Sequence, residues 1–266
     1  MPDQPPLTAG NARVKDARRL SRRSVRTERR LFLADGPKAV EGALEAGCVV
    51  EVFTTSDASQ RYAALVAAAP RVSLVDDRAL TSLSDSVTPA GVVAVCSFLD
   101  VTLESALATA REGSSLLVVC ADVRDPGNAG TIVRTADALG ADAVVLAGHS
   151  VDPYNPKSVR ASVGSLFHLP VALEPDPAAA VVAAQGAGLV VLAADGAGEL
   201  ALSDAHEILA GPTAWLFGNE AWGLPVELAA LADHRVRIPI HGRAESLNLA
   251  AAAAVCLYTS AREQRR

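Results

Sequence analysis

The sequence predicts an α/β protein made of two successive series of strands and helices. Three observations lead to this prediction. Short apolar runs alternate with helical stretches along most of the 266 residues. The run at residues 116–121 is continuously apolar, which is typical of a strand buried on both faces of a parallel sheet. Polar, Gly-containing loops follow three apolar runs, and ligands of open α/β sheets bind at the carboxyl ends of strands.

The composition limits the chain to one large or two ordinary domains, and we expect two. Four cysteines (Cys48, Cys96, Cys120 and Cys256) lie in apolar runs without a CxxC pair, as reduced thiols of a cytoplasmic protein do. No histidine lies at metal-ligand spacing from another histidine or a cysteine, so we expect no metal. We find neither a signal peptide in MPDQPPLTAG nor a stretch that suits a membrane span.

The net charge of −6 is unevenly distributed. Residues 13–30 hold nine basic and two acidic residues, a net +7, which leaves −13 on the other 248 residues. We therefore expect residues 1–30 to be a basic segment that binds a polyanion such as RNA. The expected contacts are Arg18, Arg19, Arg22, Arg23 and Arg26. A solvated Arg-rich helix is the alternative, and because basic side chains fall on most faces of residues 11–30, we expect a helix there only with outside help such as phosphate.

Residues 31–98 are expected to form the first α/β module, because strands and helices alternate there. It contains no catalytic constellation, so we expect it to do structural or substrate-holding work. The expected strands are 32–36 (with a turn), 49–54, 72–75 and 92–98, and the expected helices are 37–46 and 59–69. Residues 99–114 are expected to be a linker, with a connecting helix at 99–112.

Residues 115–266 are expected to form the second α/β domain. Its expected strands are 116–121, 144–147, 170–173, 189–193, 213–217 and 236–240, the last with Pro239 inside it. One expected helix follows the loop at 122–130, and others lie at 157–167, 178–185 and 225–232.

The last expected helix, residues 249–258, carries no charge on any face. Such a helix has no solvent side, so we expect it to be buried all round by another helix or a second subunit. Ser246 and Asn248 are good helix-starting residues at its entrance. A polar loop that leads into a buried helix is a place for a small ligand.

Three loops are therefore candidates for chemistry: residues 122–130, 218–225 and 241–245. The first lacks the lysine of a Walker P-loop, and Gly127 and Gly130 do not fit the G-x-G-x-x-G spacing of dinucleotide-binding folds. A nucleotide triphosphatase or a dehydrogenase is thus disfavoured.

The residues in these loops resemble the three motifs of the SpoU (TrmH-like) RNA ribose 2′-O-methyltransferases of the SPOUT class. They occur in family order and at family spacing: Asn128-x-Gly130-x-x-x-Arg134-Thr135-Ala136, Phe217-Gly218-Asn219-Glu220-x-x-Gly223-Leu224, and Ile238-Pro239-Ile240-x-Gly242-x-x-x-Ser246-Leu247-Asn248. Ile240 stands where the family usually has Met. We expect this replacement to have no effect, because both side chains are apolar and of similar volume. Residues 31–98 resemble the family's L30e-like substrate-binding domain, with Thr88-Pro89-x-Gly91-Val92 at its exit.

The resemblance implies an α/β trefoil knot with a parallel sheet, S-adenosylmethionine bound in the knot, and a homodimer with the site at the subunit interface. It implies that the cofactor is held by Gly218, Ile238 and Leu247, with Phe217, Ala193, Ala194, Asp195 and Gly196 as further wall. Core packing is the alternative for Ile238 and Leu247, and a tight turn is the alternative for Gly218.

The resemblance also implies catalytic residues: Arg134, with Asn128, Glu220, Ser246 and Asn248 around it. A ribose 2′-hydroxyl must lose a proton as it attacks the methyl group. A guanidinium is not deprotonated in proteins, so we expect Arg134 to clamp a phosphate and orient the ribose instead. The alternative for Arg134 is an ion pair with Asp137 or Asp122. The alternative for the other four is a helix-capping or turn-forming role.

The expected function is S-adenosylmethionine-dependent 2′-O-methylation of RNA, with 23S ribosomal RNA as the first choice. Transfer RNA is the alternative substrate. A non-catalytic RNA-binding or ribosome-assembly protein of the same fold is the alternative class, and the full set of polar motif residues argues against it. No sequence feature names the target nucleotide.

Overall fold

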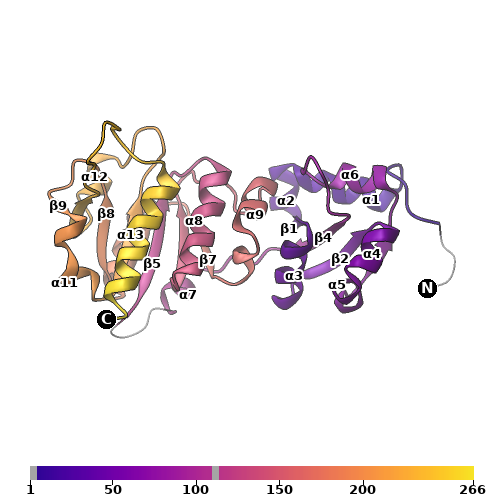
Figure 1. Cartoon of the computed structure of the whole chain (residues 1–266), viewed down its shortest axis with the longest axis horizontal. Helices are drawn as coiled ribbons and strands as arrows, with labels where there is room; N and C mark the ends of the chain where they lie inside the picture. Colours follow the sequence, from indigo (N-terminus) through magenta and orange to yellow (C-terminus); the bar gives the residue numbers. More distant parts are fainter. Residues whose placement is uncertain (1–4, 110–113) are drawn as a thin grey trace. The chain divides into compact units, whose positions relative to one another are not determined.

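A computed structural model describes residues 5–109 and 114–266, which form two compact α/β units (Figure 1). The first unit contains the chain up to Leu99 together with Asp152–His168, and the second contains Asp100–Val151 and Leu169–Arg266. In the expected linker, the helix α7 spans only Leu103–Leu107. Residues 110–113 of that linker and residues 1–4 of the basic segment lie outside the described part.

The first unit is built on a mixed four-stranded sheet in the order β1-β4-β2-β3. The β1–β4 and β4–β2 pairs are antiparallel and the β2–β3 pair is parallel. The strands are β1 Leu31–Asp35, β2 Val49–Thr54, β3 Val72–Leu74 and β4 Val92–Ser97. The helices that follow the basic segment are α3 Pro37–Glu45, α4 Ser56–Arg61, α5 Ala63–Ala68, α6 Asp77–Leu83 and α9 Pro156–Ser162. The sequence patterns did not predict α6, although Asp76 caps it by accepting the Ala79 N–H at 2.6 Å.

The basic segment is folded onto this unit through apolar contacts, a source of helix stabilisation that the sequence analysis did not consider. It forms α1 Ala12–Arg18, a 3₁₀ turn Arg19–Ser21 and α2 Arg23–Arg29. Val14, Leu20 and Val25 are buried in one cluster with Val75 and Leu80. Burial of these apolar side chains stabilises the two short helices, which isolated peptides of this length would not form.

Arg26 is not available to RNA, so its assignment as an RNA contact was wrong. Its side chain is 2% exposed, and its Nε and Nη2 donate to Asp152 Oδ2 at 2.9 and 2.6 Å. Its Nη1 donates to the carbonyls of Leu20 at 2.9 Å and Ser21 at 2.8 Å. Arg18, Arg19, Arg22 and Arg23 are exposed.

Residues 152–168 lie in the first unit, whereas the sequence placed them within the second domain. Two interactions explain the difference. One is the buried ion pair of Asp152 with Arg26. The other is an aromatic cluster in which the Tyr154 ring lies 3.9 Å from Phe98 and 4.6 Å from Phe32, centroid to centroid. The Tyr154 hydroxyl also accepts the backbone N–H of Leu99 at 2.6 Å.

The second unit confirms the expected parallel sheet. Its seven strands lie in the order β7-β6-β5-β10-β8-β11-β9, and every pair is parallel. The strands are β5 Leu116–Ala121, β6 Ala143–Ala147, β7 Val171–Glu174, β8 Val190–Ala194, β9 Leu200–Ala201, β10 Thr213–Phe217 and β11 His234–Arg237. The expected strand at 236–240 therefore ends before Pro239, which has no N–H to donate to a neighbouring strand.

Helices cover both faces of this sheet. They are α7, α8 Pro126–Ala138, α10 Pro177–Gly186, α11 His206–Leu209, α12 Val226–Ala229 and α13 Leu249–Glu263. Side chains of α7 and α10 share a core with Ala214 and Leu216 of β10. Trp215 between them points to the opposite face, where its Nε1 donates to Ser260 of α13 at 2.8 Å. On that face α13 runs beside α8 (Figure 1).

The charge-free helix is not buried on every side within one chain. Ala253, Cys256 and Leu257 face the sheet and are fully buried. Val255 and Tyr258 on the opposite side of α13 are 39% and 59% exposed. One subunit alone therefore leaves an apolar strip of α13 uncovered, and the expectation that a second subunit covers it stays a prediction.

The described part of the chain contains no helix long and apolar enough to cross a bilayer. All four cysteines are buried free thiols. Burial, and secondarily the Glu220 carboxylate, raises the pKa of Cys120 to about 12, so this thiol stays protonated at neutral pH.

Replacement of Arg26 by Ala should destabilise the first unit strongly. The variant leaves the Asp152 carboxylate buried without its partner, which typically costs about 3–5 kcal/mol of unfolding free energy. Denaturant unfolding of the wild type, Arg26→Ala and the exposed control Arg23→Ala measures the effect. A loss no larger in Arg26→Ala than in Arg23→Ala would contradict a structural role for the pair.

Candidate functional site

The three motif loops meet at the carboxyl edge of the parallel sheet. Asn128, at the start of α8, donates from Nδ2 to Glu220 Oε1 at 3.3 Å. Its Oδ1 accepts a hydrogen bond from Asn248 Nδ2 at 3.1 Å. One chain of amide and carboxylate contacts thus joins residues that lie 92 and 120 positions apart.

The Glu220 carboxylate holds the first loop in place. Its Oε2 accepts the backbone N–H of Arg124 at 3.1 Å, and its Oε1 accepts that of Asp125 at 3.0 Å. Partial burial by itself would raise the pKa of Glu220. Hydrogen bonds outweigh this effect, and they come from the backbone N–H groups of Asp125, Glu220 itself and Arg124 and from the side-chain amide of Asn128. The pKa of Glu220 is therefore lowered, and the carboxylate is charged at neutral pH.

Asn219 joins the second motif to the first, a role that sequence reasoning did not assign to it. Its side chain is buried and donates from Nδ2 to the Asp122 carbonyl at 2.7 Å. Its backbone N–H and C=O exchange hydrogen bonds of 2.9 Å with Gly223, which closes a tight turn. The sequence signal that could have identified this role is the position of Asn219 inside the second motif. A side-chain amide buried at the end of a strand needs hydrogen-bond partners.

Gly218 is required by the same turn. A Cβ at this position would overlap the Gly223 backbone and lie 2.6 Å from Leu224 N. The tight-turn alternative for Gly218 therefore holds, whether or not a ligand also approaches it. A larger residue at 218 would displace the loop rather than only fill a ligand space.

Asn248 caps a helix, which was the alternative expected for it, and it also contacts the first motif. Its Oδ1 accepts the N–H groups of Ala250 at 2.9 Å and Ala251 at 3.3 Å, which caps α13. Its Nδ2 remains available for Asn128. Asp125 caps α8 in the same way by accepting the Asn128 N–H at 2.8 Å.

A cavity of about 340 Å³ opens between these loops and the ends of β8, β10 and β11. Most of the residues expected to bind the cofactor line it, together with two of the polar set: Ala194, Asp195, Gly196, Phe217, Gly218, Ile238, Leu247, Glu220 and Ser246. Ala193 is fully buried in the core of the sheet and is not among the lining residues, so the structure does not place it in the cavity wall.

The cavity suits a small ligand with a flat apolar group. Its volume lies within the range of small-molecule sites, roughly 300–1,000 Å³. Phe217, Ile238 and Leu247 supply apolar surface, and no atom lies within 4 Å of the position that a Cβ would take at Gly196. Among residues 5–109 and 114–266, no group of three or more His, Cys, Asp or Glu side chains is arranged to hold a metal ion.

The loop at 195–199 is held by Arg235, which sequence reasoning missed. Arg235 Nε contacts Asp195 Oδ2 at 3.1 Å, and its Nη1 contacts Glu199 Oε1 at 3.0 Å. Gly198 packs against the Arg235 backbone, where a Cβ would lie 2.7 Å from the carbonyl carbon. No motif or spacing marks Arg235, because its partners lie on a loop 36 or more positions earlier.

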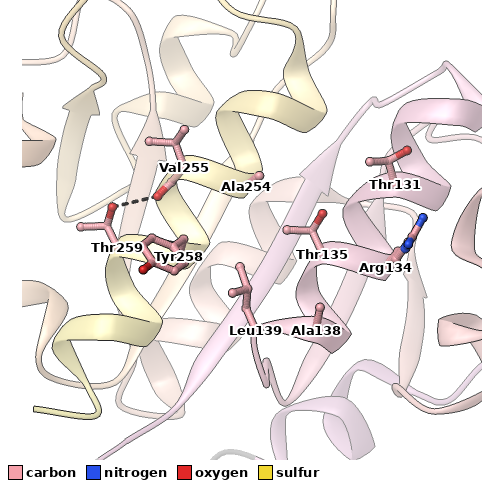
Figure 2. A pocket seen from close by; sticks show the side chains of 9 residues that line it. All are labelled: Thr131, Arg134, Thr135, Ala138, Leu139, Ala254, Val255, Tyr258 and Thr259. Atoms are coloured by element: carbon pink, nitrogen blue, oxygen red, sulfur yellow. Dashed lines mark hydrogen bonds between the residues drawn. The ribbon is translucent and has the colours of Figure 1, made fainter.

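Arg134 is not among the residues that line this cavity. It lies at a second hollow of about 610 Å³ on the exposed face of α8 and α13 (Figure 2). The hollow is formed by Thr131, Arg134, Thr135, Ala138, Leu139, Ala254, Val255, Tyr258 and Thr259. The structure of one chain thus brings Glu220 and Ser246 to the cavity and links Asn128 and Asn248 to Glu220 beside it. It leaves Arg134 on a neighbouring surface.

Replacement of Glu220 by Gln should remove a pH-dependent part of the stability. Because folding lowers the Glu220 pKa below its ordinary value of 4.5, its contribution is present above that pH and is lost as the pH falls through the folded-state pKa. Denaturant unfolding at several pH values should show the advantage of the wild type over Glu220→Gln shrinking below about pH 4.5. Glu227→Gln, at an exposed site on α12, is the control, and an advantage that is constant with pH would contradict the assignment.

Comparison with known proteins assigns both parts of the chain. Residues 115–258 match the model of the SpoU rRNA Methylase family, and residues 11–94 match that of an MRM3-like substrate binding domain. The second match begins within the basic segment, in agreement with its packing on the first unit.

Relatives cover nearly the whole chain. The 23S rRNA (guanosine(2553)-2′-O)-methyltransferase RlmP of Bacillus subtilis is 34% identical over 94% of this chain and 96% of its own length. A structure of an AdoMet-bound rRNA methyltransferase from Sinorhizobium meliloti has a TM-score of 0.82 and 35% identity over 95% of both chains. The SpoU methyltransferase AviRb from Streptomyces viridochromogenes, in complex with AdoMet, has a TM-score of 0.84 and 33% identity over 96% of this chain and 98% of its own. With a family model over more than half of its length and a relative that matches almost end to end, this chain belongs to the SpoU rRNA methylase family.

Proposed function

We propose that the protein transfers a methyl group from S-adenosylmethionine to a ribose 2′-hydroxyl of 23S ribosomal RNA. The observation that carries this proposal is the linkage of Glu220, Asn128 and Asn248 beside a cavity of about 340 Å³. Family membership supports the reaction, and relatives named for 23S rRNA favour ribosomal over transfer RNA. We expect the protein to act in the cytoplasm.

The cavity residues fit S-adenosylmethionine, which when bound supplies an activated methyl group. Phe217, Ile238 and Leu247 would enclose its adenine between apolar surfaces. Gly196 leaves room for the ligand, and Asp195 is oriented by its ion pair with Arg235. The glycine turn at 218–223 would let backbone groups approach the ligand closely.

The polar residues divide into positioning and contact roles. Both oxygens of Glu220 already accept hydrogen bonds from Arg124, Asp125 and Asn128, so Glu220 is a positioning residue and not a general base. Ser246 lines the cavity with an exposed side chain and is the candidate for a proton relay. Arg134 would clamp a phosphate next to the target ribose.

We propose further that the protein is a homodimer through the face of α8 and α13. The hollow there is lined mainly by apolar side chains, and Val255 and Tyr258 on it are 39% and 59% exposed. A second copy would cover this strip, as the charge-free sequence of residues 249–258 demands. Arg134 lies at the same hollow, so dimer formation would bring it to a subunit boundary near the catalytic loops.

The family resemblance also leads us to propose the trefoil knot. After β11, which lies next to the sheet edge, the chain runs through residues 238–248 and returns to pack α13 against β5 and β10 at the centre of the sheet. This path is compatible with threading of the last helix through a preceding loop. The chain trace of residues 190–266 in an experimental density map tests it, and an unthreaded path would refute it.

Two substitutions should separate cofactor binding from methyl transfer. Gly196→Phe should abolish S-adenosylmethionine binding in calorimetry, because its ring would occupy the cavity. Arg134→Lys should bind the cofactor normally but lose most transfer to 23S rRNA, because a point charge cannot reproduce a planar bidentate clamp. Gly186→Phe, on an exposed helix end away from the cavity, is the control for Gly196→Phe.

Mapping of ribose methylation in RNA from cells with and without the protein identifies the substrate. A 23S rRNA methyl group that is absent only from cells without the protein supports the proposal. If such a methyl group is instead found only in tRNA, the substrate is tRNA and not 23S rRNA. No difference in either RNA would favour the non-catalytic alternative. Wild-type turnover by Arg134→Lys would refute the clamp.

Tyr258→Glu should convert the dimer to monomers, because it places a charge in the apolar strip between α8 and α13. Light scattering after size-exclusion chromatography measures the mass. Val182→Glu, at an exposed apolar position of α10 on the other face of the sheet, is the matched control. A monomeric wild type, or a Tyr258→Glu variant that stays dimeric, would show that this face is not the interface.

Replacement of Arg18, Arg19, Arg22 and Arg23 together by Ala should flatten the salt dependence of RNA affinity. Each lost phosphate contact reduces the slope of log K against log salt by about 0.7–0.9. This variant replaces a deletion of residues 1–30, which would also remove the buried Val14, Leu20 and Val25. Parallel salt plots for the variant and the wild type would place the RNA-binding surface elsewhere.

A further inference from the structure

A large aromatic side chain lies exposed among the catalytic loops. Trp222, in the turn after β10, is 57% exposed, whereas Trp215, the other tryptophan of the chain, is fully buried. An indole ring that stays in water forgoes a large hydrophobic stabilisation. A partner that covers the ring would recover it.

The turn presents Trp222 in a fixed position beside the cavity. The backbone exchange between Asn219 and Gly223 closes the turn, and the Ala221 N–H donates to Asn219 Oδ1 at 2.8 Å. Ala221 and Gly223, the residues on either side of Trp222, both line the cavity. The ring therefore borders the site on a short, internally hydrogen-bonded loop.

A cation accompanies the ring. The guanidinium carbon of Arg124 lies 5.5 Å from the centre of the Trp222 ring, within the range of a cation–π interaction. Arg124 is itself exposed, and its backbone N–H is held by Glu220 at 3.1 Å. The first and second motif loops thus jointly present an aromatic surface next to a positive charge.

We propose that Trp222 is a stacking platform for a base of the substrate RNA, with Arg124 beside it to meet the RNA backbone. This inference rests on the proposed function and adds a residue that recognises the nucleotides around the target. Exposed aromatic rings bind unpaired bases through their faces, and a nearby arginine supplies both charge and stacking. Single-stranded loops and bulges of RNA expose unstacked bases, and such bases are the partners that fit this surface.

Tryptophan fluorescence tests the platform without any turnover. Decaadenylate titrated into the full-length protein should quench the exposed Trp222, while inorganic polyphosphate, which carries charge without bases, should bind without comparable quenching. In Trp222→Phe only the buried Trp215 emits, so the quenching should disappear. Unchanged emission at decaadenylate concentrations where anisotropy shows saturation would overturn the proposal. Resistance of Trp222 to quenching by acrylamide in the free protein would also overturn it, by showing that a second copy covers the ring.

Methylation kinetics provide the second test. Trp222→Ala should weaken binding of the RNA substrate about 5- to 150-fold, as expected for loss of one stacked base. The loss should appear mainly in KM, and Trp222→Phe, which keeps an aromatic face, should restore most of it. S-adenosylmethionine affinity should not change in either variant. Equal KM values for wild type and Trp222→Ala would refute the platform but not the methyl transfer. A wild type that transfers no methyl group would refute the proposed function, and the fluorescence titration would then decide the platform by itself.

Discussion

The site depends on one carboxylate. Glu220 accepts hydrogen bonds from two backbone N–H groups of the first loop and from the amide of Asn128, which in turn accepts from Asn248. These contacts hold together three loops that follow different strands, and their arrangement determines the shape of the cavity. Because the same contacts lower the pKa of Glu220, the carboxylate stays charged and keeps its acceptors available at neutral pH.

Further contacts hold the second motif in place. Asn219 closes its turn on Gly223 and attaches it to the Asp122 carbonyl, and Gly218 fits only because it has no side chain. The residues between these fixed points are free to face the ligand or the RNA. Trp222, exposed on this turn, is one of these residues.

The charged residues show how burial changes the meaning of a sequence pattern. Arg26 belongs to a run of basic residues, yet its guanidinium is enclosed by Asp152 and two backbone carbonyls. The ion pair attaches residues 152–168 to the first unit and forms part of its core. Arg18, Arg19, Arg22 and Arg23 remain on the surface, where their charge can act on a polyanion.

The sequence by itself determined the α/β class, the parallel sheet of the second unit and the family, because these depend on local apolar runs and on motif residues at set spacing. Strands β5 and β10 agree with their expected bounds for that reason, since β5 is a continuous apolar run and β10 is apolar after Thr213. The motif residues were also found by spacing alone, although their contacts with one another were not.

Only the tertiary structure decided which long-range partners these residues have. Three interactions join positions that are far apart in the chain. They are the hydrogen bond between Asn128 and Asn248, the ion pair of Asp195 with Arg235 and the buried ion pair of Arg26. The exposure of Val255 and Tyr258 likewise could not be predicted from the sequence, because the helix carries no charged residue in this stretch to mark a solvent face. Local patterns report which side chains prefer water, but the burial of a side chain and the partner of its polar atoms depend on the packing of the whole chain.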